Sequence, residues 1–295
     1  MTTTLTLSPT HASTVQDFFE LLKPRVMSLV VFTAAVGLGI APGAMHPFLA
    51  CMTILCIALG AGAAGALNMW YDRDIDAIMV RTATRPIPSG RIAPDDALTF
   101  GLVLSFFSVF FLDLVAGWKP TLFLAFSIFF YVVIYTMYLK RRTVQNIVIG
   151  GAAGAFPPMI GWLASAGTLS LEPIMLFLMI FLWTPPHFWA LSLYQHDDYK
   201  RANVPMMPVV YGAKRTKIEI VVYTIALVIG SLLYPLAAKT GVFYVGTATI
   251  LGVMFLAKTI VLLRSDDKKE GLKVFFFSIF YLFTLFLAIF IDHRV

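Results

Sequence analysis

Charge is the scarcest property of this sequence. Of its 295 residues only 13% are charged and 59% are hydrophobic, and the mean hydropathy is +0.84. A soluble globular domain usually carries about 25% charged residues. Several apolar runs reach the roughly 20 residues that an α-helix needs to cross a bilayer. The composition therefore excludes an ordinary soluble domain and predicts an all-α, polytopic membrane protein.

Cysteine is almost absent, and the targeting signals are missing too. Cys51 and Cys56 lie in one apolar run without the spacing of a metal site, so we expect both to be small core residues. Residues 1–14 are rich in Thr and Ser, contain no Arg and lack a compact apolar core. That pattern argues against a secretory signal or a mitochondrial transit peptide. We therefore expect a protein of the bacterial inner (plasma) membrane.

Nine apolar segments are predicted to span the membrane as a single domain, residues 23–295. An N-terminal tail and a short amphipathic helix at the interface, together residues 1–22, precede this domain. The interfacial helix covers residues 15–22, with Phe18, Phe19, Leu21 and Leu22 expected to face lipid. The predicted spans are residues 25–44, 48–67, 96–117, 121–139, 145–166, 173–193, 218–238, 242–263 and 273–291.

Lys and Arg are distributed unevenly between the two sides of these spans. On this topology 18 of the 22 lie on one side, whereas Lys119, Lys239 and Arg294 lie on the other and Lys258 lies within a span. Cytoplasmic loops carry the excess of Lys and Arg in membrane proteins. The N-terminus and the two long loops, after the second and sixth spans, are therefore predicted to be cytoplasmic, and the C-terminus periplasmic.

The first long loop begins with a row of oxygen ligands. Asn68, Asp72 and Asp76 are four residues apart, which places them on one face of an α-helix. Such a row suits Mg²⁺, which binds one or two carboxylates together with phosphate oxygens. Asp74 would point about 160° away from this face. A solvated loop with ordinary ion pairs is the alternative interpretation.

Arginines accompany these acids, at positions 73, 81, 85 and 91. The guanidinium fork binds phosphate bidentately. A metal site, an anion site and an apolar bundle together suggest an amphiphilic diphosphate, its head on Mg²⁺ and its tail between helices. Mg²⁺ and arginines would stabilise a departing diphosphate, so that an allylic C–O bond could ionise.

The second long loop runs from His196 to Pro208 and contains Asp197, Asp198, Lys200 and Arg201. Because both long loops are predicted on the same side, we expect them to meet. The Lys140-Arg141-Arg142 run is either a further part of this site or only a topology signal.

One histidine lies inside a predicted span, in the stretch Trp183-Thr-Pro-Pro-His187-Phe-Trp189. The two prolines are expected to loosen the helix. His187 is then either a kink residue bonded to a neighbouring helix or a group that binds a substrate. Asn146 and the Pro157-Pro158 pair form a similar polar break in the fifth span.

Taken together, these motifs resemble the UbiA superfamily of intramembrane prenyltransferases and, more narrowly, its heme O synthase branch, the protoheme IX farnesyltransferases. The resemblance covers residues 23 to about 212. The stretches that carry it are Lys23-Pro-Arg25-Val, Asn68 to Asp76, Thr84 to Arg91, Tyr135 to Arg142, Asn146 to Gly151, Pro157 to Trp162, Thr184 to Ala190, and Asp198-Tyr199 with Pro205 to Pro208.

The resemblance implies nine transmembrane helices around a central cavity with a lateral opening to lipid. It also implies transfer of a farnesyl group from farnesyl diphosphate to a vinyl group of heme b, the cation then being quenched by water. Mg²⁺ is the implied cofactor. The implied partners are farnesyl diphosphate, heme b and the bilayer, with a terminal oxidase assembly or heme A synthase as a further partner and no nucleic acid.

The resemblance also assigns residues. The implied catalytic and metal-binding residues are Asn68, Asp72, Asp76 and Asp198. The implied substrate-binding residues are Lys23, Arg25, Arg81, Arg85, Arg91, Lys140, His187, Tyr199, Lys200 and Arg201. The second acidic motif departs from the superfamily pattern of two aspartates four apart, because Asp197 and Asp198 are adjacent and Tyr199 follows. This departure puts a second metal site in doubt.

Two alternatives remain. A prenyltransferase with a quinone-precursor ring or a chlorophyllide as acceptor is the first, although the Thr184-Pro-Pro-His187-Phe-Trp189 stretch argues for heme. The second is a transporter or channel with a cytoplasmic cation gate. Transporters place ionisable groups near the middle of the bilayer, whereas the acids here lie at the ends of spans.

Overall fold

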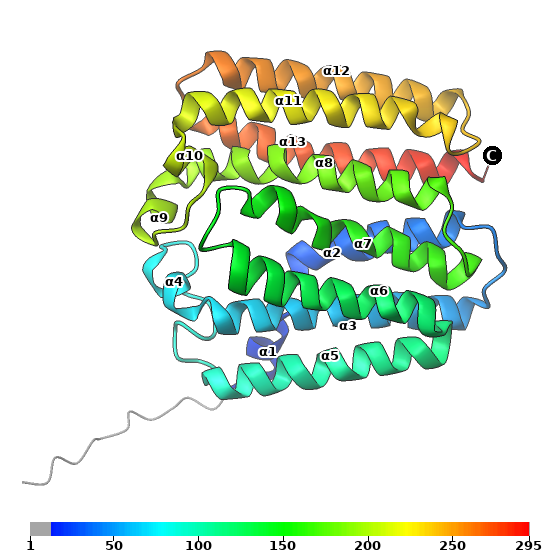
Figure 1. Ribbon diagram of the computed structural model, residues 1–295, viewed down its shortest axis with the longest axis horizontal. Coiled ribbons are helices and arrows are strands. Elements are labelled where there is room, and N and C mark those ends of the chain that lie inside the picture. Colours follow the sequence, from blue (N-terminus) through cyan, green and yellow to red (C-terminus); the bar gives the residue numbers. More distant parts are fainter. Residues whose placement is uncertain (1–12, 295) are drawn as a thin grey trace, which may run out of the picture.

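Long apolar helices dominate the computed structural model, which describes residues 13–294 (Figure 1). Within those residues eight helical segments are long and apolar enough to cross a membrane, and the bent pair α1 (Val15–Leu21) and α2 (Pro24–Ile40) makes a ninth. The eight are α3 (Pro47–Tyr71), α5 (Pro94–Ala116), α6 (Trp118–Phe129) with the π-helix η1 (Phe130–Leu139), α7 (Asn146–Ala166), α8 (Leu171–Tyr194), α11 (Gly212–Leu233) with the 3₁₀-helix η2 (Tyr234–Leu236), α12 (Val242–Arg264) and α13 (Lys269–Asp292). The predicted spans are thereby confirmed.

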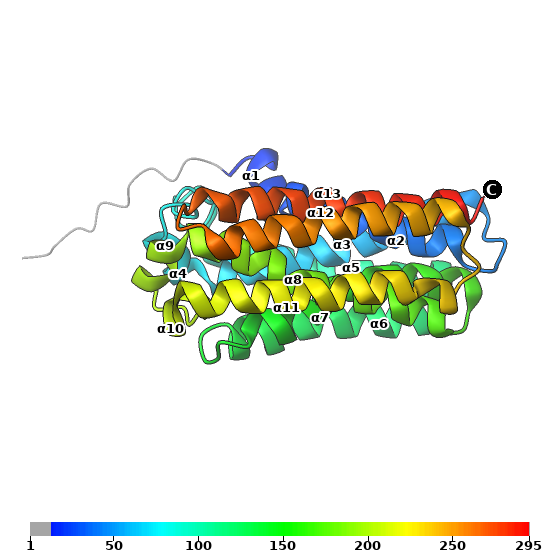
Figure 2. The same cartoon turned by 90° about the horizontal axis from the view of Figure 1, so that it is seen from above.

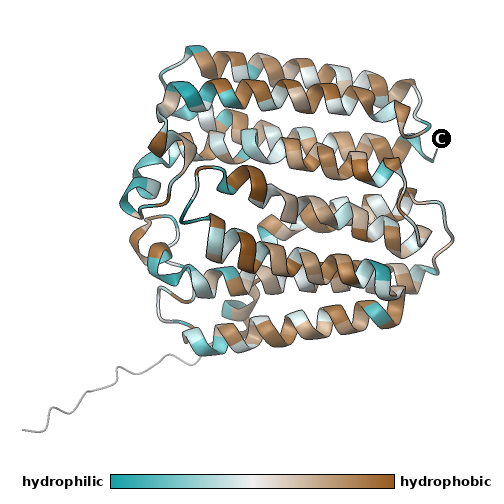
Figure 3. Ribbon diagram, in the orientation of Figure 1, coloured by the Kyte–Doolittle hydropathy of each residue, from teal (hydrophilic) through white to brown (hydrophobic). Residues whose placement is uncertain are grey.

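The spanning helices run side by side, and their ends differ in character (Figures 1 and 2). Three short helices, α4 (Arg73–Ile78), α9 (His196–Arg201) and α10 (Met207–Val210), gather at one end of the bundle, and the C-terminus lies at the other. Hydrophilic residues concentrate in these short helices and their loops, while the long helices are mostly apolar (Figure 3). The two long loops therefore meet at one end, as the predicted topology requires.

Helices α2 and α7 pack closely because glycine lies at their contact. A Cβ on Gly161 would lie 2.2 Å from the backbone oxygen of Ala34, and one on Gly37 would lie 2.1 Å from that of Pro158. No side chain larger than hydrogen fits at either position without moving the helices apart. Small residues at such interfaces let helix backbones approach closely in membranes.

The proline pairs do not interrupt their helices. Both α7, with Pro157 and Pro158, and α8, with Pro185 and Pro186, continue through them. A proline lacks the N–H that would bond the carbonyl four residues earlier, so Pro157 leaves the carbonyl of Ala153 free. The Ser127 hydroxyl of α6 donates to that carbonyl at 3.2 Å. A neighbouring helix thus supplies the donor to the carbonyl that Pro157 frees, as expected of a proline in a span, while both helices continue without a break.

Two predictions about exposure need correction. Leu21 does not face lipid, since it is fully buried in a cluster with Ile87 and Ile92, and Phe18 packs against the same cluster. One face of α1 therefore packs against the rest of the protein, and the other face exposes Phe19. Cys56 is buried as expected, whereas Cys51 is exposed. The predicted N-terminal tail lies almost wholly outside the described residues.

Candidate active site

The predicted row of oxygen ligands lies where α3 gives way to α4. Asp72 lies between α3 and α4, and the backbone hydrogen bonds from its N–H to the Asn68 carbonyl (2.9 Å) and from the Asp76 N–H to the Asp72 carbonyl (2.8 Å) continue the helical pattern across the junction. The three residues keep one face and are only 3%, 0% and 2% exposed for Asn68, Asp72 and Asp76. The side chain of Asp74 points away and is 59% exposed, as the helical spacing predicts.

A cation lies against each member of this row. The Lys23 ammonium donates to the side-chain amide oxygen of Asn68 at 2.6 Å. The Lys140 ammonium pairs with Asp72, and the Arg85 guanidinium pairs with Asp76 at 2.6 Å. Buried carboxylates persist only when they are paired or hydrogen-bonded, so these cations explain how two aspartates tolerate burial.

Lys23 reaches the site because the chain turns sharply there. It separates α1 from α2 and takes a left-handed backbone conformation, with φ of 52°. Burial, together with repulsion from Arg85 and Lys140, lowers the pKa of Lys23 to about 7. Burial disfavours the charged form of an amine, and nearby like charges add to the effect. Lys23 therefore lies close to two other cations of the site, Arg85 and Lys140.

Thr136 is a site residue that the sequence analysis missed. The Asn68 amide donates to Asp72 at 2.8 Å and to the Thr136 hydroxyl at 3.0 Å, and that hydroxyl donates to the carbonyl of Tyr131 at 2.8 Å. This last contact spans five residues within the π-helix η1. Such segments are rare and frequent at functional sites. Thr136 is fully buried, and nothing in the sequence indicated that it lies beside Asn68.

Arg141 is more than a topology signal. Its guanidinium donates to both Asp74 oxygens, at 2.6 and 2.7 Å, and lies 3.5 Å from Asp72. It also lies 4.9 Å from the Tyr71 ring centroid. The hydrogen bond from Arg141 is the main reason that the pKa of Asp74 is lowered. Arg141, just beyond η1, therefore contacts the acidic residues of the site at Asp72 and Asp74.

The other predicted cations lie farther from the row. Arg25, Arg81 and Lys200 are exposed. Arg91 is bound to α1 through Asp17 and Glu20. The structure therefore brings Lys23, Arg85 and Lys140 onto the acidic row and leaves these four outside its direct contacts.

The second acidic motif lies at the same end of the bundle as the first, on α9 near α4 (Figures 1 and 2). Tyr199, on α9, is buried in the same hydrophobic cluster as Ile75 of α4 and Met79 just beyond it. Asp198 pairs with Arg201, and the exposed Asp197 pairs with Lys268 at 3.4 Å. No hydrogen bond or ion pair among the described residues joins Asp198 to the Asn68–Asp76 row.

His187 is packed between aromatic rings inside the bundle. Its Nδ1 is hydrogen-bonded to the Ser278 hydroxyl of α13 at 2.7 Å. Its ring stacks on Trp183, with centroids 4.1 Å apart, and on Phe275, with centroids 4.5 Å apart. The bond to a neighbouring helix was one of the two roles expected, and it leaves Nε2 as the ring atom for any ligand.

The donor set fits a metal that is shared with a substrate. Two carboxylates and one amide oxygen form the row, and the described residues contain no group of three or more His, Cys, Asp or Glu that could hold a metal alone. Mg²⁺ binds in this way, through one or two carboxylates with phosphate oxygens and water completing its shell. The ring of cations beside the row would accept the same phosphates.

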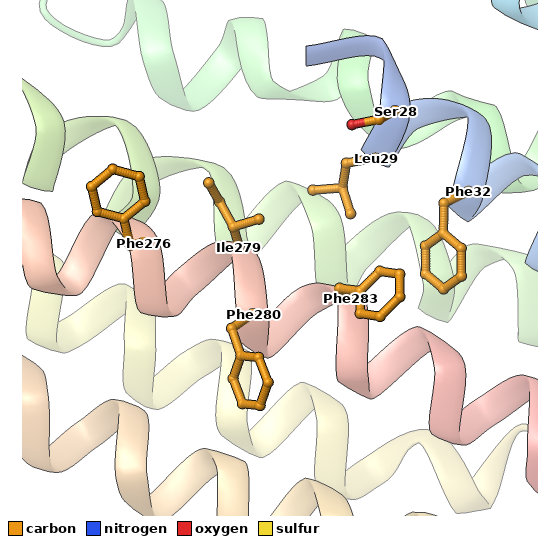
Figure 4. A pocket seen from close by; sticks show the side chains of 7 residues that line it. All are labelled: Ser28, Leu29, Phe32, Phe276, Ile279, Phe280 and Phe283. Atoms are coloured by element: carbon orange, nitrogen blue, oxygen red, sulfur yellow. The ribbon is translucent and has the colours of Figure 1, made fainter. Parts of the chain in front are cut away.

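An apolar groove opens on the outer side of the bundle between α2 and α13 (Figure 4). It measures about 370 Å³. Leu29 and Phe32 of α2 and the phenylalanines of α13 line it, and Ser28 is its one polar side chain. A groove of this composition suits an isoprenoid or acyl chain.

The helical bundle and its acidic, cation-lined end define a polytopic membrane protein built to bind a polyanion beside an apolar interior. The model of the UbiA prenyltransferase family matches residues 30–285. The chain belongs to this family.

Curated relatives cover nearly the whole chain. It is 56% identical to a protoheme IX farnesyltransferase of Rhizobium rhizogenes, over 95% of this chain and 89% of that protein. It is 54% identical to one of Parvibaculum lavamentivorans, over 94% and 88%.

Solved structures share the fold at low sequence identity. A digeranylgeranylglyceryl phosphate synthase matches with a TM-score of 0.77 and 19% identity, over 95% of this chain and 98% of that one. A UbiA homolog from Archaeoglobus fulgidus bound to DMAPP and Mg²⁺ matches with a TM-score of 0.66 and 17% identity, over 92% and 99%. At such identities the likeness establishes the fold.

Proposed function

We propose that this protein transfers the farnesyl group of farnesyl diphosphate to a vinyl group of protoheme IX. The reaction type rests on one observation, the buried Asn68–Asp72–Asp76 row with Lys23, Lys140 and Arg85 against it. The choice of substrates rests on identity of more than half over nearly the whole chain with protoheme IX farnesyltransferases.

The reaction begins with cleavage of the C1–O bond of farnesyl diphosphate, whose electron pair leaves with the diphosphate. The terminal vinyl carbon of heme then attacks the allylic cation, and water adds to the neighbouring carbon and loses a proton. The product gains one farnesyl group and one hydroxyl group. Charge develops on the departing diphosphate, so positioned cations lower the barrier most at that step.

The cations of the site are suited to this step. Lys23, Lys140 and Arg85 are held within hydrogen-bond distance of the acidic row before substrate binds. Donors that are already oriented need little reorganisation free energy during the reaction. We assign exposed Arg25 and Arg81 to the longer-range attraction of the diphosphate.

Asn68, Asp72 and Asp76 would hold Mg²⁺. When bound there, the metal offsets the negative charge of the diphosphate. The Mg²⁺ bound with DMAPP in the UbiA homolog from Archaeoglobus fulgidus supports the use of a divalent metal. Asp198 lies in the second loop, and we propose that it joins the site when the diphosphate draws the two loops together.

Heme is proposed to bind on the α8 and α9 side. His187 would contact it through Nε2, because Nδ1 is committed to Ser278. Lys200 and Arg201 of α9 would meet the propionates, and the buried Tyr199 would line the proposed heme site. The groove between α2 and α13 is the proposed lateral opening for the isoprenoid chain.

The basic residues and the short helices share one end of the bundle, which supports a cytoplasmic site. We propose a multi-pass protein of the bacterial inner membrane with a periplasmic C-terminus. A terminal oxidase assembly or heme A synthase would receive the product.

The test is to incubate the purified protein with farnesyl diphosphate, Mg²⁺ and heme b and to measure the mass of the heme product. Gain of one farnesyl and one hydroxyl group is expected. An unmodified heme alongside prenylation of a quinone precursor or a chlorin would contradict the proposed acceptor.

A further inference from the structure

The loop between α4 and α5 carries Arg85 to the active site but is not part of a long helix. Two contacts of its own hold it near the acidic row: the Thr82 hydroxyl donates to the carbonyl of Asp76 at 2.9 Å, and Arg85 pairs with Asp76. The other end of the loop, residues 87–92, packs against α1. Ile87 and Ile92 are buried in one small cluster with Leu21 of α1.

Arg91 fixes that far end to α1. One terminal nitrogen of its guanidinium pairs with Asp17. The other donates to Glu20 at 2.9 Å and to the carbonyl of Thr84 at 2.9 Å, and Nε donates to the hydroxyl of Ser89 at 3.1 Å. All three guanidinium nitrogens are therefore committed to protein atoms, and the residue ties two loop positions to two carboxylates of α1.

Helix α1 is stabilised by a capping box and by packing against α5. A capping box between Thr14 and Asp17 fixes its first turn, which satisfies backbone donors that a short helix would otherwise leave free. Asp17 is only 6% exposed, and Phe18 packs edge-on against Phe100 of α5 with centroids 5.1 Å apart. At its other end α1 leads directly into Lys23, whose ammonium bonds Asn68.

From this arrangement we infer that Arg91 is a positioning residue rather than a diphosphate ligand, and that α1 is a brace that holds the 79–93 loop over the active site. The inference rests on the proposed function, in which that loop binds diphosphate through Arg85. A displacement of about 1 Å at a reacting site reduces turnover by up to about a hundredfold. Freeing the loop should therefore lower turnover. Because the loop carries Arg85, it should also weaken binding of farnesyl diphosphate.

A double-mutant cycle on the KM for farnesyl diphosphate separates positioning from direct binding. Asp17→Asn with Glu20→Gln removes both charges and keeps the size of each side chain. We expect this variant and Arg91→Ala each to raise that KM by about tenfold, with the KM for heme unchanged. Combining all three substitutions should be no worse than either set, because each breaks the same contact. Arg91→Lys should recover part of the loss.

If Arg91 bound diphosphate directly, removing the two carboxylates would leave the KM unchanged or lower it. Arg91→Ala would still raise it in that background. Either result would overturn the inference. Arg215→Gln is the matched control, since Arg215 pairs with Glu219 within α11, and its KM should equal that of the wild type.

Hydrogen exchange without substrate tests the brace independently of any activity. Amides of residues 82–92 should exchange faster in Arg91→Ala and in the Asp17→Asn, Glu20→Gln variant, but not in Arg215→Gln. Unchanged exchange in the first two would refute the brace even if farnesyl transfer is confirmed. Faster exchange in a protein that fails to farnesylate heme would refute the proposed function alone.

Discussion

At the scale of single residues, the active site depends on buried charges that neighbouring side chains make tolerable. Asp72 is fully buried and meets Lys140 and the Asn68 amide, with Arg141 at 3.5 Å. Removing one partner of such a group leaves an uncompensated buried charge, which is strongly destabilising. Substitutions here therefore need a folding control beside the activity measurement.

Asp72→Ala and Asp76→Ala should each reduce farnesyl transfer by about a hundredfold or more, because each removes a group that acts on developing charge. Asp74→Ala is the matched control on the opposite face of α4, and its loss should be much smaller. Product mass measures activity, and gel filtration in detergent checks folding. A dead Asp74→Ala beside a fully active Asp72→Ala would show that the helical face has been assigned wrongly.

His187→Ala should raise the apparent KM for heme by about tenfold and leave that for farnesyl diphosphate nearly unchanged. The imidazole would be lost from the proposed heme side of the bundle. Ser278→Ala is the control, because it removes the partner of Nδ1 and keeps the ring. A Soret band that shifts only in His187→Ala would indicate iron ligation. Equal KM values for heme in the wild type and both variants would show that His187 only packs within the bundle and does not contact heme.

At the scale of elements, the α2–α7 contact is the place where one methyl group matters most. Gly161→Ala would push a Cβ against the carbonyl of Ala34 at 2.2 Å, so the helices must separate. We expect a lower midpoint of thermal unfolding. Gly154→Ala lies in the same helix with no atom within 4 Å of the added carbon. It should leave the midpoint unchanged or raise it, and equal losses in both variants would contradict the close contact.

The C-terminal end of α13 contains a pH-sensitive clasp. His293 Nε2 lies 2.7 Å from Glu172 of α8, and this hydrogen bond raises the pKa of His293 above its usual 6.5. The folded protein therefore binds the proton more tightly than the unfolded chain. The added stability is fully present below about pH 6.5 and is lost as the pH rises through the raised pKa.

Thermal unfolding midpoints measured from about pH 6 to about pH 9 test this clasp. The wild type should lose stability across the range, and His293→Ala should lose less of it. His46→Ala removes an exposed histidine that caps the first turn of α3, so its midpoint should be lower, but its change with pH should parallel that of the wild type. Parallel curves for the wild type and His293→Ala would show that the clasp contributes nothing.

The elements that the sequence predicts are those with a periodic or compositional signal. The nine spans follow from apolar runs, and the Asn68–Asp72–Asp76 face follows from the spacing of four. The π-helix η1 has no comparable signal, so the place of Thr136 beside Asn68 could not be predicted. Arg91 and Asp17 are 74 residues apart, and only the packing of α1 against the loop brings them together.

At the scale of the whole molecule, the bundle separates its chemistry by depth. Polar and charged residues gather where α4, α9 and α10 lie, and the spans supply an apolar body beneath them (Figure 3). A diphosphate head and an isoprenoid tail require this same division. The excess of Lys and Arg at that polar end is the basis for the cytoplasmic position proposed for it.

Farnesyl transfer to heme is proposed to depend on a metal that the acidic row shares with the diphosphate. The most direct measurement is the mass of the heme product in a thoroughly chelated sample, before and after Mg²⁺ is added. We expect no farnesylated heme in EDTA and full recovery with Mg²⁺, because the cations alone leave the charge of a diphosphate only partly offset in a low-dielectric site. Undiminished farnesylation in the chelated sample would contradict this dependence on a metal.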